Sequence, residues 1–154
     1  MNKTIIAIYG RQEEGKSATI KLAFQHLTTK YPNAIFDRHL NMSGDILTVV
    51  ELNGTKIGFE SQGDPNSRII SQDTLRKLAD QSFDAVLGGC DIIICATRTE
   101  GNTVKKVDHI ASTFGYFTLW MSSYFSPKLN HKVLNQKAAE NIVDMITSLM
   151  LGQL

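Results

Sequence analysis

Continuous apolar runs and amphipathic stretches alternate along this chain. The first run, Thr4–Tyr9, is short, rich in isoleucine and almost free of polar residues. Such a run is typical of a strand that is buried on both faces of a parallel sheet. Gly10 ends it, and Gly15–Thr29 then carries apolar residues at helical spacing until Tyr31-Pro32 stops the pattern. The chain therefore begins with a predicted strand, a loop and a helix.

The same criteria predict further strands and helices in alternation. The predicted strands after the first are Ala34–Asp37, Asp45–Leu52, Thr55–Glu60, Asp91–Thr97 and Tyr116–Tyr124. The predicted helices after the first are Ser71–Phe83, Thr103–Phe114 and His131–Leu151. This alternation predicts an α/β fold, a three-layer sandwich around a mostly parallel sheet, with no internal repeat and no linker.

One turn is expected to break the parallel arrangement. Asn53-Gly54 separates two strand-like runs, and this dipeptide is a strong signal for a two-residue hairpin, because both central positions need a positive φ. We therefore expect one antiparallel hairpin in the sheet. A chain of 154 residues has room for one domain, which we expect to span residues 1–154.

Composition and charge limit the classes of function. Sixteen Lys and Arg against fifteen Asp and Glu give a net charge of +1, so no general attraction for nucleic acid is expected. No apolar stretch approaches the roughly 18 residues of a membrane span, and the N-terminus lacks the regions of a signal peptide. Cys90 and Cys95 lack the spacing of a metal pair, and Cys95 is expected to be a small buried hydrophobe. We expect a cytoplasmic protein with no membrane partner.

The loop after the first strand carries the main chemical signal. Gly10-Arg11-Gln12-Glu13-Glu14-Gly15-Lys16-Ser17 matches G-x-x-x-x-G-K-[S/T], and it follows a strand and opens a helix, as this motif requires. The sequence here resembles the Walker A motif of the P-loop nucleoside triphosphatase superfamily. That resemblance implies a nucleotide-binding loop formed by Gly10, Arg11, Gln12, Glu13, Glu14, Gly15, Lys16, Ser17 and Ala18.

The loop residues suit phosphate and Mg²⁺ for physical reasons. Gly10 and Gly15 allow successive backbone N–H groups to point inward at the positive end of a helix. Lys16 would reach the terminal phosphates, and the Ser17 hydroxyl would join the oxygen shell of a Mg²⁺ ion. Glu13 and Glu14 are unusual beside phosphate. We expect their side chains to point outward into solvent, and the alternative is that they contact a basic partner.

A second strand end is expected to complete the site. Glu60 ends the strand Thr55–Glu60, and Gly63 follows three residues later. A hairpin before a strand with this acid-x-x-Gly ending resembles the layout of Ras-like GTPases, although the family has aspartate where this chain has Glu60. The resemblance implies that Glu60 organises the metal and that Gly63 senses the γ-phosphate. Asp64 would position the attacking water, or it is only a turn residue ahead of Pro65.

The sequence signals for residues that bind the base and the γ-phosphate are weaker. After Phe117–Met121 the Ras-like family would show Asn-Lys-x-Asp for guanine, whereas this chain has Ser122–Ser126, so ATP is the default expectation over GTP. Tyr124 or Phe125 could stack on a base or could simply pack. Arg98 follows a buried strand and could face the γ-phosphate, or it could form a salt bridge with Glu100 or Glu14.

Other polar residues have more ordinary interpretations. Asp37-Arg38-His39 could bind an acceptor, and Ser43 could add a magnesium-shell hydroxyl. Gly88-Gly89 is expected to form a tight loop before a strand, not a phosphate contact. The other three histidines are expected to be surface or interhelical residues without metal-ligand spacing; they are His26, His109 and His131.

Together these features predict Mg²⁺-dependent binding of a nucleoside triphosphate and its hydrolysis. Lys16, Asp64 and Arg98 are the expected catalytic residues, acting through positioning and charge neutralisation. Two alternatives remain open. One is a small nucleotide or metabolite kinase, and the other is a nucleotide-dependent switch or adaptor that acts on a protein partner with little turnover. The apolar residues on more than one face of the last helix are also compatible with a homodimer.

Overall fold

The computed structural model describes residues 1–11, 14–37, 44–61, 74–99 and 101–154. Its strands are β1 (Thr4–Tyr9), β2 (Leu47–Leu52), β3 (Thr55–Glu60), β4 (Ile92–Thr97) and β5 (Phe117–Ser122). Its helices are α1 (Lys16–Lys30), α3 (Thr74–Ala79), α4 (Asn102–Phe114) and α5 (His131–Met150). Most bounds agree with the sequence patterns to within two residues, which is the usual uncertainty at element ends.

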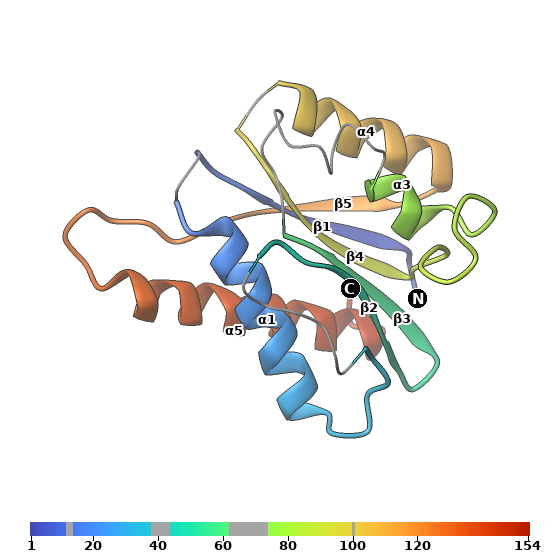
Figure 1. The fold of residues 1–154 in the computed structure, drawn as a ribbon, viewed down its shortest axis with the longest axis horizontal. Helices are drawn as coiled ribbons and strands as arrows, with labels where there is room; N and C mark the ends of the chain where they lie inside the picture. The colour runs from blue at the N-terminus through green and yellow to red at the C-terminus, as the bar shows by residue number, and fades with distance from the viewer. Residues whose placement is uncertain (12–13, 38–43, 62–73, 100) are drawn as a thin grey trace.

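The strands form one sheet in the order β2-β3-β4-β1-β5. The pairs β3–β4, β4–β1 and β1–β5 are parallel, and only β2–β3 is antiparallel. Helices α1 and α5 lie on one face of the sheet, and α3 and α4 lie on the other (Figure 1). The predicted α/β sandwich with a mostly parallel sheet is therefore confirmed.

The apolar core is divided by the sheet into two parts. Successive side chains of a strand point to opposite faces, so Ile6 and Ile8 of β1 face α1 and α5, whereas Ile5 and Ala7 face α3 and α4. Every residue of β4 is buried, as its uninterrupted apolar run predicted. Cys95 lies in this strand as a free, buried thiol, and burial raises its pKa well above the ordinary value.

The hairpin between β2 and β3 has the predicted turn. Asn53 and Gly54 both have positive φ, at 50° and 80°. These angles suit a two-residue connection whose twist matches that of the flanking strands. The antiparallel pair follows directly, with Leu52 opposite Thr55 and Leu47 opposite Glu60.

The short strand expected at Ala34–Asp37 is wrong. Only Ile35 pairs with another strand, through two backbone hydrogen bonds of 2.9 Å that it exchanges with Glu51. The Ile35 side chain is 71% exposed, so no sheet face buries it. A single bridge leaves the segment outside the sheet, although Ala34 is buried and Phe36 packs against the core.

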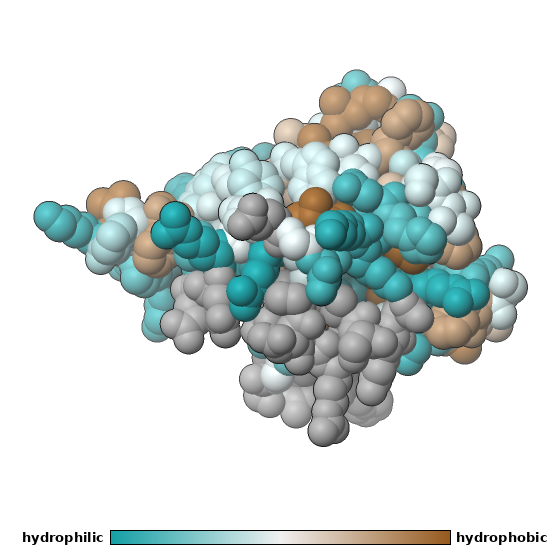
Figure 2. Space-filling model, turned by 90° about the horizontal axis from the view of Figure 1, so that it is seen from above, coloured by the Kyte–Doolittle hydropathy of each residue, from teal (hydrophilic) through white to brown (hydrophobic). Residues whose placement is uncertain are grey.

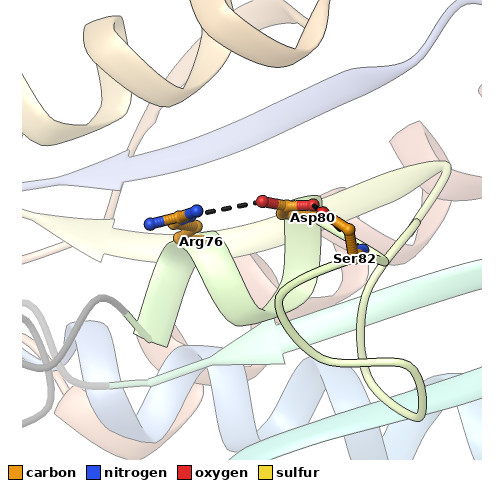
Figure 3. A network of polar contacts seen from close by, with 3 residues as sticks. All are labelled: Arg76, Asp80 and Ser82. Atoms are coloured by element: carbon orange, nitrogen blue, oxygen red, sulfur yellow. Dashed lines mark hydrogen bonds and ion pairs between the residues drawn. The ribbon is translucent and has the colours of Figure 1, made fainter.

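The helix expected at Ser71–Phe83 ends earlier than predicted, because α3 stops at Ala79. Its expected first residues, 71–73, lie outside the described part. Asp80 explains the stop (Figure 3). Its Oδ1 accepts hydrogen bonds from the backbone N–H and the hydroxyl of Ser82, and its Oδ2 lies 3.3 Å from Arg76 Nε. A carboxylate that binds the backbone two residues ahead favours a turn over another helical turn.

The loop that follows needs its glycines. A β-carbon on Gly88 would lie 2.3 Å from the carbonyl oxygen of Asp80, and Gly89 has a φ of +77°. The predicted tight loop at Gly88-Gly89 is confirmed, since neither position accommodates an ordinary side chain without strain.

The surface is mixed in character. Seen from above, the coloured atoms show hydrophobic patches that are separated by hydrophilic ones (Figure 2). Within the described ranges, no helix combines the length and the apolarity that crossing a bilayer requires.

Candidate functional site

The carboxyl ends of β1 and β4 set the position of the site. The two strands are parallel neighbours, with Tyr9 opposite Thr97 at their carboxyl ends. After β1 the chain enters α1 on one face of the sheet, whereas after β4 it enters α4 on the opposite face (Figure 1). Ligands of open α/β sheets bind where neighbouring strands diverge in this way.

Lys16 lies at the carboxyl ends of these two strands. Its side chain is buried, with 8% exposure, and its Nζ donates hydrogen bonds to the carbonyl oxygens of Gly10, at 2.7 Å, and Thr97, at 2.6 Å. The ammonium group therefore links the ends of both strands. Carbonyl oxygens are neutral acceptors, so they orient the ammonium without cancelling its charge.

Gly15 joins the loop to α1 in a conformation that favours glycine. It has a φ of +81° and occupies the N-cap of α1. A β-carbon on Gly15 would lie only 2.5 Å from Oδ1 of Asn135, a residue of α5. The Thr19 hydroxyl also donates to this oxygen, at 3.5 Å. The end of the loop is thus packed against α5 through Asn135, which the sequence patterns did not single out.

The expectation that Glu14 points outward is wrong. Its side chain is half-buried, and its Oε2 accepts a hydrogen bond of 3.1 Å from the backbone N–H of Arg11. A loop N–H without a strand partner needs an acceptor, and this carboxylate supplies one from within the loop. Gln12 and Glu13 lie outside the described residues.

Ser17 is paired with a carboxylate that the sequence analysis did not assign. Its hydroxyl donates to Asp45 Oδ1 at 2.8 Å, and the Ser61 hydroxyl donates to the same oxygen at 3.0 Å. Ser61 also accepts the backbone N–H of Ile46, which fixes the segment before β2 against the end of β3. Ser17 and Asp45 are far apart in the sequence, so their contact could not be predicted without the fold.

The structure places Glu60 away from Ser17. Its neighbour Phe59 packs in the core on the side of α1, so Glu60 faces α3 and α4. There it borders a cavity of about 10 Å³ that Thr103 and Lys106 also line.

Burial raises the pKa of Glu60 from 4.5 to about 8, because desolvation disfavours the charged carboxylate. A hydrogen bond from Thr74 and the charge of Lys106 act in the opposite direction. Its Oε2 has no hydrogen-bond partner among the described residues. Burial thus favours the neutral form of Glu60, and the metal-organising role that the Ras-like resemblance implied stays a prediction.

Two buried hydroxyls flank the loop. Ser123, just after β5, has its Oγ 3.0 Å from the point where a β-carbon on Gly10 would lie, and Thr97 ends β4 on the other side. Neither hydroxyl oxygen has a hydrogen-bond partner within the described ranges. Ser123 could not be predicted from the sequence, because one serine after a strand gives no signal.

The remaining expected residues fall into three groups. Arg11 and Ala18 are exposed at the loop, and Arg98 follows Thr97, with its backbone N–H bonded to the Thr103 hydroxyl at 2.9 Å. Tyr124 and Phe125 lie between β5 and α5, where Tyr124 contacts Asn141 and Phe125 packs against His131. The expected residues outside the described ranges are Arg38, His39, Ser43, Gly63, Asp64 and Glu100.

The histidine predictions are confirmed where the structure describes them. His26 of α1 lies 4.0 Å from Glu140 of α5, and His109 and His131 are exposed. No cluster of three or more His, Cys, Asp or Glu side chains with the arrangement of a metal site occurs in the described part of the chain.

Comparisons with protein-family models, with curated proteins and with solved structures found no match to this chain.

Proposed function

We propose that this chain binds a nucleoside triphosphate, with Mg²⁺, through the loop from Gly10 to Ser17 and hydrolyses it. The observation that carries this proposal is the position of Lys16. Its buried ammonium bridges the carboxyl ends of β1 and β4, at the N-terminus of α1. A fixed cation beside the positive end of a helix attracts a polyvalent anion more than either feature would alone.

The loop supports a phosphate ligand in a second way. Gly15 adopts the left-handed conformation that turns backbone N–H groups toward a common point at the start of α1. The arrangement requires Gly15 itself, since Asn135 leaves no space for a larger residue. A sterically enforced glycine in this loop is therefore consistent with the phosphate-binding role implied by the motif.

Ser17 and Asp45 fit a Mg²⁺ ion. The ion prefers oxygen ligands and binds through one or two carboxylates together with phosphate oxygens and water. The Ser17 hydroxyl and the Asp45 carboxylate lie 2.8 Å apart at the first turn of α1. When bound, Mg²⁺ would neutralise charge on the phosphates, while Ser17 and Asp45 would hold it beside the loop.

The proposed reaction is attack of a water oxygen on the γ-phosphorus, with cleavage of the bond to the β-phosphate oxygen. The products are a nucleoside diphosphate, inorganic phosphate and a proton. Lys16 and the loop N–H groups would stabilise the charge on the transferring group, which needs little covalent chemistry from the protein. Arg98 directly follows Thr97, whose carbonyl oxygen accepts a hydrogen bond from Lys16. Its guanidinium would approach the transferring phosphoryl group. ATP stays the preferred nucleotide over GTP.

A thermal-shift series tests binding. ATP, GTP and their diphosphates are added with and without Mg²⁺, and the melting temperature of the full chain is recorded. A triphosphate at about 100 times its Kd should raise the melting temperature by about 5–10 °C. Diphosphates, and triphosphates without Mg²⁺, should give smaller shifts. The absence of any shift with both triphosphates in the presence of Mg²⁺ would overturn the proposal.

Release of inorganic phosphate tests turnover. We expect steady phosphate release from MgATP without any added acceptor. Release only when a nucleotide or metabolite acceptor is present would instead indicate the kinase alternative. Binding without turnover, together with a nucleotide-dependent change in protease cleavage around residues 40–70, would indicate the switch alternative.

A further inference from the structure

A hollow lies beside the candidate site. Its volume is about 260 Å³, and it is lined by Tyr9, Thr99, Val104 and Trp120. Tyr9 is 37% exposed and Trp120 is 39% exposed. Two large aromatic side chains therefore keep part of their surface open to this hollow.

The hollow lies next to the strand ends that the Lys16 ammonium bridges. Tyr9 directly precedes Gly10, whose carbonyl binds the Lys16 ammonium. Thr99 follows Thr97, the second carbonyl partner, by two residues, so their Cα atoms are at most about 7 Å apart. A ligand held by Lys16 is thus close enough to extend into the hollow.

The two aromatic rings belong to neighbouring strands and share a face of the sheet. Trp120 of β5 is opposite Ala7 of β1, and Tyr9 lies two residues beyond Ala7 on the same side of the strand. Val104 comes from the first turns of α4, which covers this face. Two rings and one aliphatic side chain make a surface that suits a flat aromatic group.

We propose that this hollow binds the base of the nucleotide, an inference that rests on the proposed function. The loop would hold the phosphates, and the sugar would carry the base onto Tyr9 and Trp120. Stacking of a base on aromatic rings depends little on the identity of the base, because every base has a π-face. For base edges, the described lining side chains offer the hydroxyls of Tyr9 and Thr99 and the indole N–H of Trp120. Adenine and guanine are therefore bound with affinities that differ only several-fold.

Trp120 is the only tryptophan of the chain, so its fluorescence reports on this hollow directly. MgATP and MgGTP should each change the emission of the wild-type protein, with the same Kd that calorimetry gives for binding. Magnesium tripolyphosphate, which has no base, should bind to the loop and leave the emission unchanged. An unchanged emission at saturating MgATP would overturn the inference.

Substitution of Trp120 separates the base from the phosphates. Trp120→Leu should weaken MgATP binding about tenfold, because a base–aromatic stack is lost, and should leave tripolyphosphate binding unchanged. Trp120→Phe keeps an aromatic ring and should retain most of the affinity. Equal MgATP affinity in Trp120→Leu and the wild type would contradict the inference.

Two other exposed aromatic residues allow a comparison: Phe83 is a matched control, and Phe125 tests the alternative position of the base. Phe83 is 45% exposed and packs on Arg76 after α3, and Phe125 is 46% exposed and packs on His131 before α5. Phe83→Ala and Phe125→Ala should both bind MgATP like the wild type. Loss of affinity in Phe125→Ala but not in Trp120→Leu would place the base between β5 and α5 and overturn the inference.

The outcomes also distinguish this inference from the proposed function. If neither MgATP nor magnesium tripolyphosphate binds, the proposed function fails and the inference fails with it. If both bind equally tightly and both depend on Lys16, the phosphate site stands and only the base-binding hollow is refuted.

Discussion

Asn135 of α5 lies directly against Gly15 of the loop, with its Oδ1 2.5 Å from the point where a β-carbon on Gly15 would be. Two causes therefore enforce glycine at this position: a φ of +81° and the absence of space. Helix α5, which is the last element of the chain, supports the loop that follows the first strand. The geometry of the proposed phosphate site depends on this contact.

Replacement of Gly15 by alanine should lower the free energy of unfolding by more than backbone strain alone would. Alanine at a positive φ costs about 1–2 kcal/mol, and contact with Asn135 adds to this cost. Gly115→Ala is a matched control, because Gly115 has a φ of +76° and no atom lies within 4 Å of the position that its β-carbon would take. Urea unfolding should show a larger loss of stability for Gly15→Ala than for Gly115→Ala.

The double variant Gly15→Ala/Asn135→Ala isolates the steric part. Removal of the carboxamide should recover part of the stability that Gly15→Ala loses, giving a non-additive cycle between the two positions. Full additivity would show that Asn135 does not restrict Gly15.

The charge of Asp45 should set the dependence of nucleotide binding on Mg²⁺. Asp45→Asn keeps an oxygen that can accept from Ser17 and Ser61, so the local structure should persist, but it removes a negative charge beside the proposed metal. We expect the Mg²⁺ concentration that gives half-maximal ATP binding to rise about tenfold, a shift of about 1.4 kcal/mol. Asp108→Asn, on the exposed side of α4, is the control, and an equal midpoint in both variants would contradict the assignment.

Glu60 should make the stability of the fold depend on pH. Burial raises its pKa to about 8 in the folded chain, so the folded state holds a proton that the unfolded state releases near 4.5. The stabilising contribution of this proton is fully present below about pH 4.5 and is lost as the pH rises through 8. The free energy of unfolding should then fall by up to about 1.4 kcal/mol per pH unit within this window.

Glu60→Gln should remove this pH dependence, because glutamine is neutral throughout. The variant should gain stability relative to the wild type as the pH rises from 5 to 9, as measured by urea unfolding. The groups that face Glu60 are Thr74 of α3, Cys95 of β4, and Thr103 and Lys106 of α4. Glu51→Gln, on the exposed side of β2, controls for loss of a carboxylate, and parallel curves for wild type and Glu60→Gln would contradict the prediction.

The sequence predicted the fold well where a local pattern decides the structure. The isoleucine runs of β1 and β4, the Asn53-Gly54 turn and the helical spacing of α1 each specify their own element. The strand predicted at Ala34–Asp37 is wrong because a strand needs continuous hydrogen bonding to a partner strand, and only Ile35 pairs, with Glu51.

Only the residues of the loop motif could be assigned to the candidate site from the sequence. Lys16 and Ser17 lie within one contiguous motif, so their proximity needs no knowledge of the fold. Asp45, Ser123 and Asn135 come from distant segments, and only the packing of the chain brings them to the loop. Glu60 could not be assigned from its place at a strand end, because the face to which its side chain points depends on the register with β4.

In the proposed function, Lys16 holds the phosphates of a nucleoside triphosphate. The most direct test of this role is calorimetric titration of Lys16→Ala and Lys30→Ala with MgATP, after circular dichroism has shown that both variants are folded. Lys30 ends the same helix, about 21 Å away, and its Nζ donates to the Thr147 hydroxyl. Lys30→Ala should bind MgATP like the wild type, whereas Lys16→Ala should lose affinity by at least about tenfold. Equal and unchanged affinity in both variants would contradict the account.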